Sequence, residues 1–248
     1  MSGHSKWATI KHKKGAADKA RGKLFAKLAR QIEVAARQGG GDIDSNATLR
    51  TMVQKAKGAQ MTKDAIDRAI KRGIGENDGA NYENVMYEGY APGGVALLVE
   101  VLTDNRNRTA SDVRSAFSKH GGSLAEPGSV GWQFSRRGIV LVDGAMSEDD
   151  ALAAALEAGA DDMERDGDQW RILTDPSFVW DVKEALERAG VPVQAAESTM
   201  VSSTTVDVHD PEDARQVLRI MDALEDNDDV QDVFANFDID EKIMQEIG

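Results

Sequence analysis

The chain has 248 residues, a formal net charge of -13, 41% hydrophobic residues and no cysteine. This length suits two or three domains with packed cores, and the absence of cysteine excludes disulfides and thiolate metal sites. No stretch approaches the roughly 20 apolar residues of a membrane helix, and no apolar run follows the charged start, so we expect a cytoplasmic protein without a membrane partner.

Charge is distributed unevenly along the chain. Residues 1–75 carry 17 Lys and Arg against 6 Asp and Glu, a net charge of +11, whereas residues 76–248 carry 13 against 37, a net charge of -24. This asymmetry predicts a basic module for polyanions attached to an acidic body. Because the acidic part would repel nucleic acid, we expect the basic face to point away from it. The alternative is that the basic surface docks on the chain's own acidic part.

Three amphipathic helices are predicted in the basic part, over residues 18–38, 47–57 and 63–72. The first places Leu28 and Ile32 on its apolar side. Short amphipathic helices cannot bury their apolar sides alone, so the three should pack into a small bundle. The first helix also carries basic residues that we predict to bind nucleic acid, and these are Lys19, Lys23, Lys27, Arg30 and Arg37.

The segment before the first helix adds further cations and a tryptophan. Neutralising phosphates releases condensed counterions, so a dense basic surface gains affinity for nucleic acid without reading its sequence. Trp7 could stack on a base, or it could anchor the segment onto the helices. The candidate nucleic-acid-binding residues here are His4, Lys6, Trp7, Lys11, His12, Lys13 and Lys14.

A strand-like periodicity begins near residue 82. The apolar run over 94–102 predicts a buried central strand, and a helix capped by Thr109 or Ser111 and a strand over 129–134 should follow. Between residues 138 and 201 the order is strand, helix, a hairpin turning at Asp166 and Gly167, helix and strand, which is ferredoxin-like.

A last strand, helix and strand begin near Thr204, and we expect them to complete the domain that the insertion interrupts. The predicted fold class is therefore α+β, with an N-terminal three-helix domain followed by two ferredoxin-like α+β domains, one inserted in the other. Such folds host many functions, so the fold alone does not indicate the chemistry. The predicted domains are 1–78, then 79–134 with 202–248, and the inserted 135–201.

Four segments carry a family resemblance, namely GHSKWATIKHKKGAADKARGKLFAKLAR, YEGYAPGGVALLVEVLTDNRNRT, DVRSAFSKHGGSL and GSVGWQF. They resemble the YebC/PmpR family, and the similarity runs along essentially the whole chain. The resemblance implies a three-domain cytoplasmic protein that is a DNA-binding transcriptional regulator. The family includes the mitochondrial translational activator of cytochrome oxidase, and the resemblance equally implies a ribosome-associated translation factor that relieves stalled ribosomes. The positions that the shared motifs mark are Gly3, His4, Ser5, Lys6, Trp7, Lys11, Lys13, Lys14, Arg106 and Arg108.

The motif TDNRNRT lies between the buried strand and the next helix. Arg106 and Arg108 beside free helix-start amides could bind phosphate, or they could pair with the carboxylates of their own domain.

The spacing of the histidines fits no metal site, and no nucleotide-binding or nucleophile motif is present, so we expect no enzyme and no cofactor. The expected partner is DNA, or ribosomal RNA in the ribosome, bound by a monomer or weak dimer. We expect Trp132, Trp170 and Trp180 in the core.

Overall fold

Three helices form the N-terminal part of the described structure. The computed structural model describes residues 17–75 and 81–247. Its first three helices pack around a core that includes Leu28, Ile32 and Leu49. All three predicted helices are confirmed, and we call them together the helical head. They are α2 (Ala17–Gly39), α3 (Ala47–Gly58) and α4 (Lys63–Ile74).

Local sequence signals set the ends and the packing of these helices. The Asn46 side chain accepts a hydrogen bond of 3.0 Å from the backbone N–H of Leu49 and caps α3, and Thr62 caps α4 in the same way. Gly73 allows α4 to lie close to α2, because a Cβ at this position would come within 2.3 Å of the Glu33 carbonyl oxygen. The head is therefore a closely packed unit.

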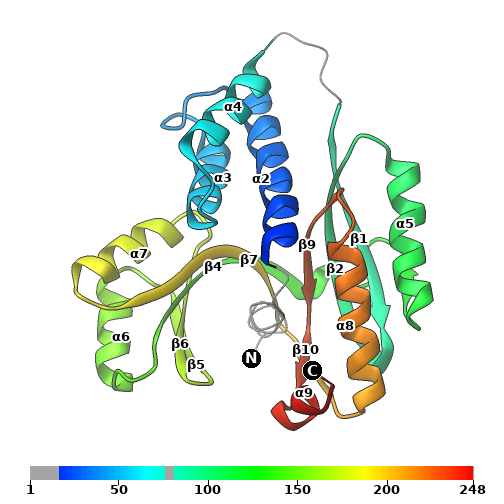
Figure 1. Cartoon of the computed structure of the whole chain (residues 1–248). Coiled ribbons are helices and arrows are strands. Elements are labelled where there is room, and N and C mark those ends of the chain that lie inside the picture. The colour runs from blue at the N-terminus through cyan, green and yellow to red at the C-terminus, as the bar shows by residue number, and fades with distance from the viewer. Residues whose placement is uncertain (1–16, 76–80, 248) are drawn as a thin grey trace.

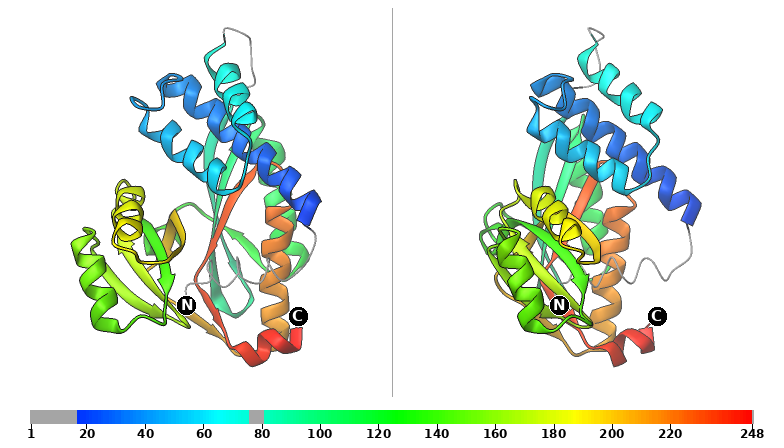
Figure 2. Two further views of the ribbon diagram at one scale, coloured as in Figure 1. Left: turned by 60° about the vertical axis from the view of Figure 1, so that its left-hand side comes forward. Right: turned by 90° about the vertical axis from the view of Figure 1, so that its left-hand side faces the viewer.

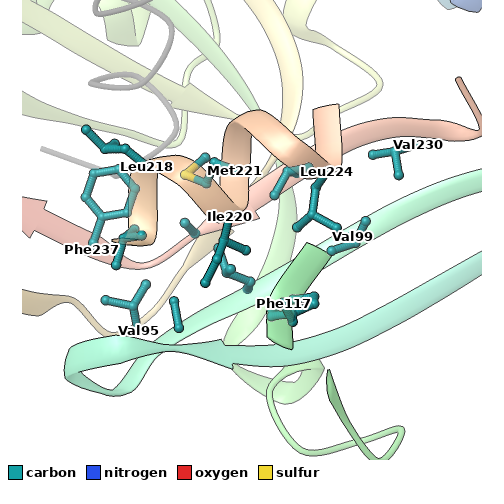
Figure 3. Close-up of a cluster of buried hydrophobic side chains, with 14 of the residues drawn as sticks. Val95, Val99, Phe117, Leu218, Ile220, Met221, Leu224, Val230 and Phe237 are labelled. Atoms are coloured by element: carbon teal, nitrogen blue, oxygen red, sulfur yellow. The ribbon is translucent and has the colours of Figure 1, made fainter. Parts of the chain in front are cut away.

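A four-stranded antiparallel sheet in the order β3-β1-β2-β9 lies beside the head (Figure 1). Helices α5 and α8 pack on it, and the hydrophobic core between them includes Phe117, Ile220 and Met221 (Figure 3). We call this the central sheet. Its elements are β1 (Glu83–Ala91), β2 (Val95–Thr103), α5 (Arg106–Lys119), β3 (Ser123–Ala125), α8 (Pro211–Glu225) and β9 (Val230–Ala235).

A second antiparallel sheet has the order β5-β6-β4-β7 and carries α6 and α7. This is the ferredoxin-like order that the sequence predicts, and the hairpin at Asp166 and Gly167 is confirmed. Figure 2 shows this inserted sheet set apart from the central sheet, with the head at one end of both. Its elements are β4 (Phe134–Asp143), α6 (Glu148–Glu157), β5 (Asp162–Asp166), β6 (Gln169–Thr174), α7 (Val179–Arg188) and β7 (Val193–Ser202).

Two details of the central sheet differ from the prediction. The strand predicted near Thr204 is β8 (Val206–Val208), which pairs in parallel with β10 (Phe237–Ile239) in a separate two-stranded sheet before α9 (Glu241–Ile247). It therefore does not join the central sheet, whose order is β3-β1-β2-β9. The α+β class is confirmed, and the domain boundaries stay predictions.

No strand spans residues 129–134. Gly131–Gln133 is a short 3-10 turn, η2, and Phe134 begins β4 of the inserted sheet. The reason is the carboxylate of Glu88, which accepts the backbone N–H groups that a strand would use for pairing.

The helix α5 begins at Arg106 and is capped by Asn105, so the prediction of a cap at Thr109 or Ser111 is wrong. Thr109 is buried, and its hydroxyl bonds to a carboxylate instead. The core prediction holds for Trp170, which is 7% exposed, but it is wrong for Trp132, which is 72% exposed.

Candidate nucleic-acid interface

Part of the basic side of α2 faces the acidic end of α8. Lys23 Nζ lies 2.8 Å from the Asp226 carboxylate, and Lys27 Nζ donates to the Glu225 carbonyl oxygen at 2.7 Å. A helix C-terminus carries a partial negative charge, and here carboxylates add to it. The two lysines therefore bind an anionic surface of the same chain.

Arg30 continues this contact towards the central sheet. Its guanidinium donates to the Asp228 carbonyl oxygen at 3.2 Å and to the Asp229 carboxylate at 3.1 Å. It also lies 5.0 Å from the centre of the Tyr82 ring. We call Lys23, Lys27 and Arg30 the docked stripe.

The carboxylate of Asp229 joins the head to the central sheet. Besides Arg30, it accepts hydrogen bonds from the Thr109 hydroxyl at 2.7 Å, the Arg108 guanidinium at 2.9 Å and the Thr103 hydroxyl at 3.2 Å. Burial by itself would raise the pKa of Asp229, but these donors outweigh burial and hold the pKa below its ordinary value. The carboxylate is thus kept ionised where two cations meet.

A further cation of the head makes a similar contact from α3. Lys55 Nζ lies 2.9 Å from the Asp232 carboxylate on β9. Burial favours the neutral amine, but the attraction and hydrogen bond of Asp232, together with the charges of Glu197 and Glu100, outweigh burial and raise the pKa of Lys55. The contact between head and body therefore spans two helices.

The prediction that the basic face points away from the acidic body is wrong for the docked stripe. The docked stripe faces the acidic body because its cations are attracted to the carboxylates and carbonyls at residues 225–229. The alternative, docking on the chain's own acidic part, describes this stripe. Of the other predicted residues on α2, Arg37 pairs with Glu33 at 2.9 Å, and the side chain of Lys19 is not described.

The two arginines of TDNRNRT have different surroundings. Arg108 pairs with Asp104 at 3.0 Å as well as with Asp229. It therefore pairs with carboxylates of its own domain, which was the alternative to phosphate binding. Arg106 is exposed, and its carbonyl oxygen accepts the Tyr87 hydroxyl at 3.2 Å. Phosphate binding by Arg106 stays a prediction.

The predicted binding residues of the N-terminal segment lie outside the described residues. Their role stays a prediction, and they are His4, Lys6, Trp7, Lys11, His12, Lys13 and Lys14.

A second group of cations lies on α4, the last helix of the head (Figure 1). Lys63, Arg68 and Lys71 are exposed, and none of them has an ion pair or side-chain hydrogen bond to another residue within 17–75 and 81–247. We call them the outer set. The buried side of α4 contains Ile66 and Ile70, and at about 100° per residue Arg68 and Lys71 lie opposite to it.

Sequence reasoning missed the outer set because Asp64 and Asp67 interrupt its cations along the chain. A helical projection of α4 could have found it, since Arg68 and Lys71 fall on the outward arc.

Within the described ranges no helix is long and apolar enough to cross a membrane. In the same residues, no group of three or more His, Asp or Glu is arranged to hold a metal ion.

Comparison with known proteins places this arrangement in a family. Residues 5–76 match the model of the TACO1/YebC protein N-terminal domain, and residues 82–237 match that of the TACO1/YebC second and third domain. A probable transcriptional regulatory protein of Rubrobacter xylanophilus is 57% identical over 250 residues, covering all of both chains. The probable transcriptional regulatory protein GSU1074 of Geobacter sulfurreducens is 52% identical, again over the whole of both chains.

A solved structure shows the same architecture. The conserved hypothetical protein Aq1575 of Aquifex aeolicus superposes with a TM-score of 0.79 at 48% sequence identity, covering 92% of this chain and 94% of the other. Both family models and the full-length relatives agree with this likeness. The chain therefore belongs to the TACO1/YebC family, a family whose bacterial relatives here are named probable transcriptional regulatory proteins.

Proposed function

We propose that this protein is a non-enzymatic, cytoplasmic regulator of transcription that binds duplex DNA through its helical head. The observation that carries the proposal is the outer set, in which three exposed cations on α4 have no side-chain partner among the described residues. The names of the relatives support a regulatory role at the general level.

The electrostatic separation within the molecule favours this surface. The net charge of -24 over residues 76–248 repels a polyanion, whereas residues 1–75 carry +11. The docked stripe lies where head and acidic body meet, so a duplex cannot contact it without displacing residues 225–229. The outer set has no such competitor among the described residues. The lysines of the N-terminal segment add to the charge of the head and would extend its footprint.

Phosphate contacts of this kind position a protein on nucleic acid without reading bases. They release counterions, so the affinity should fall steeply as salt rises. Specific recognition of a promoter would then need base contacts in addition to the outer set. Ribosomal RNA offers the same phosphates, so an RNA target on the ribosome is the outcome to be distinguished.

The test measures how the protein binds three targets, namely two DNA duplexes and the ribosome. Fluorescence anisotropy would measure affinity for a promoter duplex and for a duplex of random sequence, and sedimentation would measure association with ribosomes. We expect the promoter duplex to bind more tightly than the random duplex. Equal competition by random duplex together with stable co-sedimentation with ribosomes would replace the transcriptional role by a translational one. Absence of binding to all three would refute nucleic-acid binding.

A matched pair of variants would assign the surface. Reversing the outer set in K63E/R68E/K71E should weaken duplex binding at least tenfold. Reversing three exposed cations on α5 and α8 in R114E/K119E/R219E changes the net charge equally and should have a much smaller effect. Equal loss in both variants would indicate a response to overall charge, which contradicts a role for α4.

A further inference from the structure

An exposed tryptophan stands out on the turn η2 between the central and inserted sheets. Trp132 is 72% exposed, whereas most large apolar side chains of the described residues are in the cores. Its indole N–H donates to the Ser129 carbonyl oxygen at 3.1 Å. Because this polar edge is satisfied, the part of the ring that remains for a partner is its apolar face.

One side of the turn is fixed by a buried carboxylate. Glu88 on β1 is 8% exposed and accepts the backbone N–H groups of Gly128, Val130 and Gly131 at 2.8, 2.6 and 2.7 Å. Burial alone would raise the pKa of Glu88, but the three backbone hydrogen bonds lower it. A charged carboxylate thus holds the backbone on either side of Ser129, immediately before Trp132.

The residue after Trp132 fixes the other side. Gln133 is 7% exposed, and its side-chain oxygen accepts the Asn236 amide at 3.0 Å and the Thr204 hydroxyl. Its carbonyl oxygen accepts the backbone N–H of Ser203 at 2.8 Å. Trp132 is therefore held between two anchored residues while its own ring lies in solvent, so little conformational freedom is lost on binding.

A second aromatic side chain converges on the same oxygen. The Tyr90 hydroxyl donates to the Ser129 carbonyl at 3.1 Å, and the side chain is 38% exposed. The indole edge of Trp132 and the phenol tip of Tyr90 therefore lie within hydrogen-bond reach of one atom. Together they form a small exposed aromatic surface.

Positive charge follows directly in the sequence. From Pro127 to Val142 the chain contains Arg136 and Arg137 and no Asp or Glu, which is unusual in this acidic body. Arg136 pairs with Glu100 at 3.2 Å, and its side chain is 45% exposed. Exposed ion pairs of this kind contribute little to stability, so little is lost when Arg136 leaves Glu100 for another anion.

We propose that Trp132 is a stacking site for an unpaired nucleobase, with Arg136 binding a neighbouring phosphate of the same single strand. Stacking on an aromatic face and phosphate contact by nearby cations are the two elements of single-strand binding. Arg136 follows Trp132 by four residues, so their Cα atoms are at most roughly 14 Å apart even for a fully extended chain, which is within reach of a short single strand. The inference rests on the proposed nucleic-acid function and extends it to a second site, distinct from the head.

The test uses the full-length protein and a fluorescently labelled single-stranded decamer of uridine. Replacing Trp132 by Ala should weaken decamer binding about 5- to 150-fold, the range typical of a lost stacking contact. W132F should recover part of the affinity because it keeps an aromatic face. Duplex affinity should be unchanged in both variants. As a measurement on the unmodified protein, photocrosslinking with 5-bromouridine decamer should label the peptide that contains Trp132.

The outcomes separate this inference from the proposed function. Unchanged decamer affinity in W132A, with no crosslink at Trp132, would overturn the stacking site even if the outer set still binds duplex. Loss of duplex and decamer affinity in equal measure would also overturn it, because stacking on an unpaired base cannot act on a closed duplex. If the natural protein binds neither decamer nor duplex, the nucleic-acid function itself fails.

Discussion

The docked stripe and the outer set belong to one helical head and carry the same charge, yet their surroundings are opposite. Lys23, Lys27 and Arg30 contact the acidic end of α8, whereas Lys63, Arg68 and Lys71 are exposed and have no side-chain partner among the described residues. The difference shows that a basic stripe on a helix reveals a preference for anions but not which anion is bound. In this chain the nearest anions to the stripe are its own.

The largest loss of stability should come from substituting Asp229, the carboxylate that Arg30 of the docked stripe contacts. Asp229→Ala removes the carboxylate that Arg30, Arg108 and two buried threonine hydroxyls share, so we expect a loss of about 3 kcal/mol in the free energy of unfolding. Urea denaturation would measure it. Asp229→Asn keeps the shape and one acceptor and should lose less. A loss below about 1 kcal/mol in the alanine variant would show that the contact between head and body is weak.

A paired substitution contrasts the two surfaces directly. Arg30→Ala removes hydrogen bonds to a buried carboxylate and should lower the free energy of unfolding by about 2 kcal/mol. Arg68→Ala on the outer set should change it by less than about 0.5 kcal/mol. Equal effects in urea denaturation would contradict the assignment of one residue to a contact and the other to solvent.

Acid should weaken the docked surface selectively. The pKa of Asp229 is below its ordinary value of 3.8 in the folded protein, so its contribution to stability is present above pH 3.8 and is lost as the pH falls towards the folded pKa. For one proton the slope reaches at most about 1.4 kcal/mol per pH unit. The measurement is unfolding free energy between pH 6 and pH 3. Asp229→Asn should flatten the curve, and an unchanged slope would exclude Asp229 as its source.

The smallest effect is expected at the exposed end of the stripe. Lys23 pairs with Asp226, whose side chain is 80% exposed, and solvent screens such pairs. Asp226→Asn should therefore cost less than about 1 kcal/mol in unfolding free energy. A cost equal to that of Asp229→Ala would mean that the whole stripe acts as one buried network.

Much of the fold could be predicted from local sequence. The three helices of the head, the hairpin at Asp166 and Gly167 and the inserted ferredoxin-like order follow from periodicity and turn residues. The pairing of β1 in the central sheet could not be predicted, because strand partners depend on contacts between residues far apart in sequence. For the same reason Glu88 was not expected to fix the turn that contains Gly131.

The candidate site was only partly predictable. The charge asymmetry identified the head, and the alternative of internal docking described Lys23 and Arg30. The outer set was not predicted, because its cations alternate with carboxylates along α4. Exposure of Trp132 could not be inferred either, since an aromatic residue beside a strand pattern is usually buried.

The most direct test of duplex binding by the outer set is the salt dependence of affinity in two variants of equal charge. K63Q/K71Q removes two cations of the outer set, and K23Q/K27Q removes two of the docked stripe. Each phosphate contact contributes about 0.9 to the slope of log affinity against log salt. We expect K63Q/K71Q to lower this slope by about 1.8 and K23Q/K27Q to leave it unchanged. If K23Q/K27Q lowers the slope and K63Q/K71Q leaves it unchanged, the outer set is not the surface that binds the duplex.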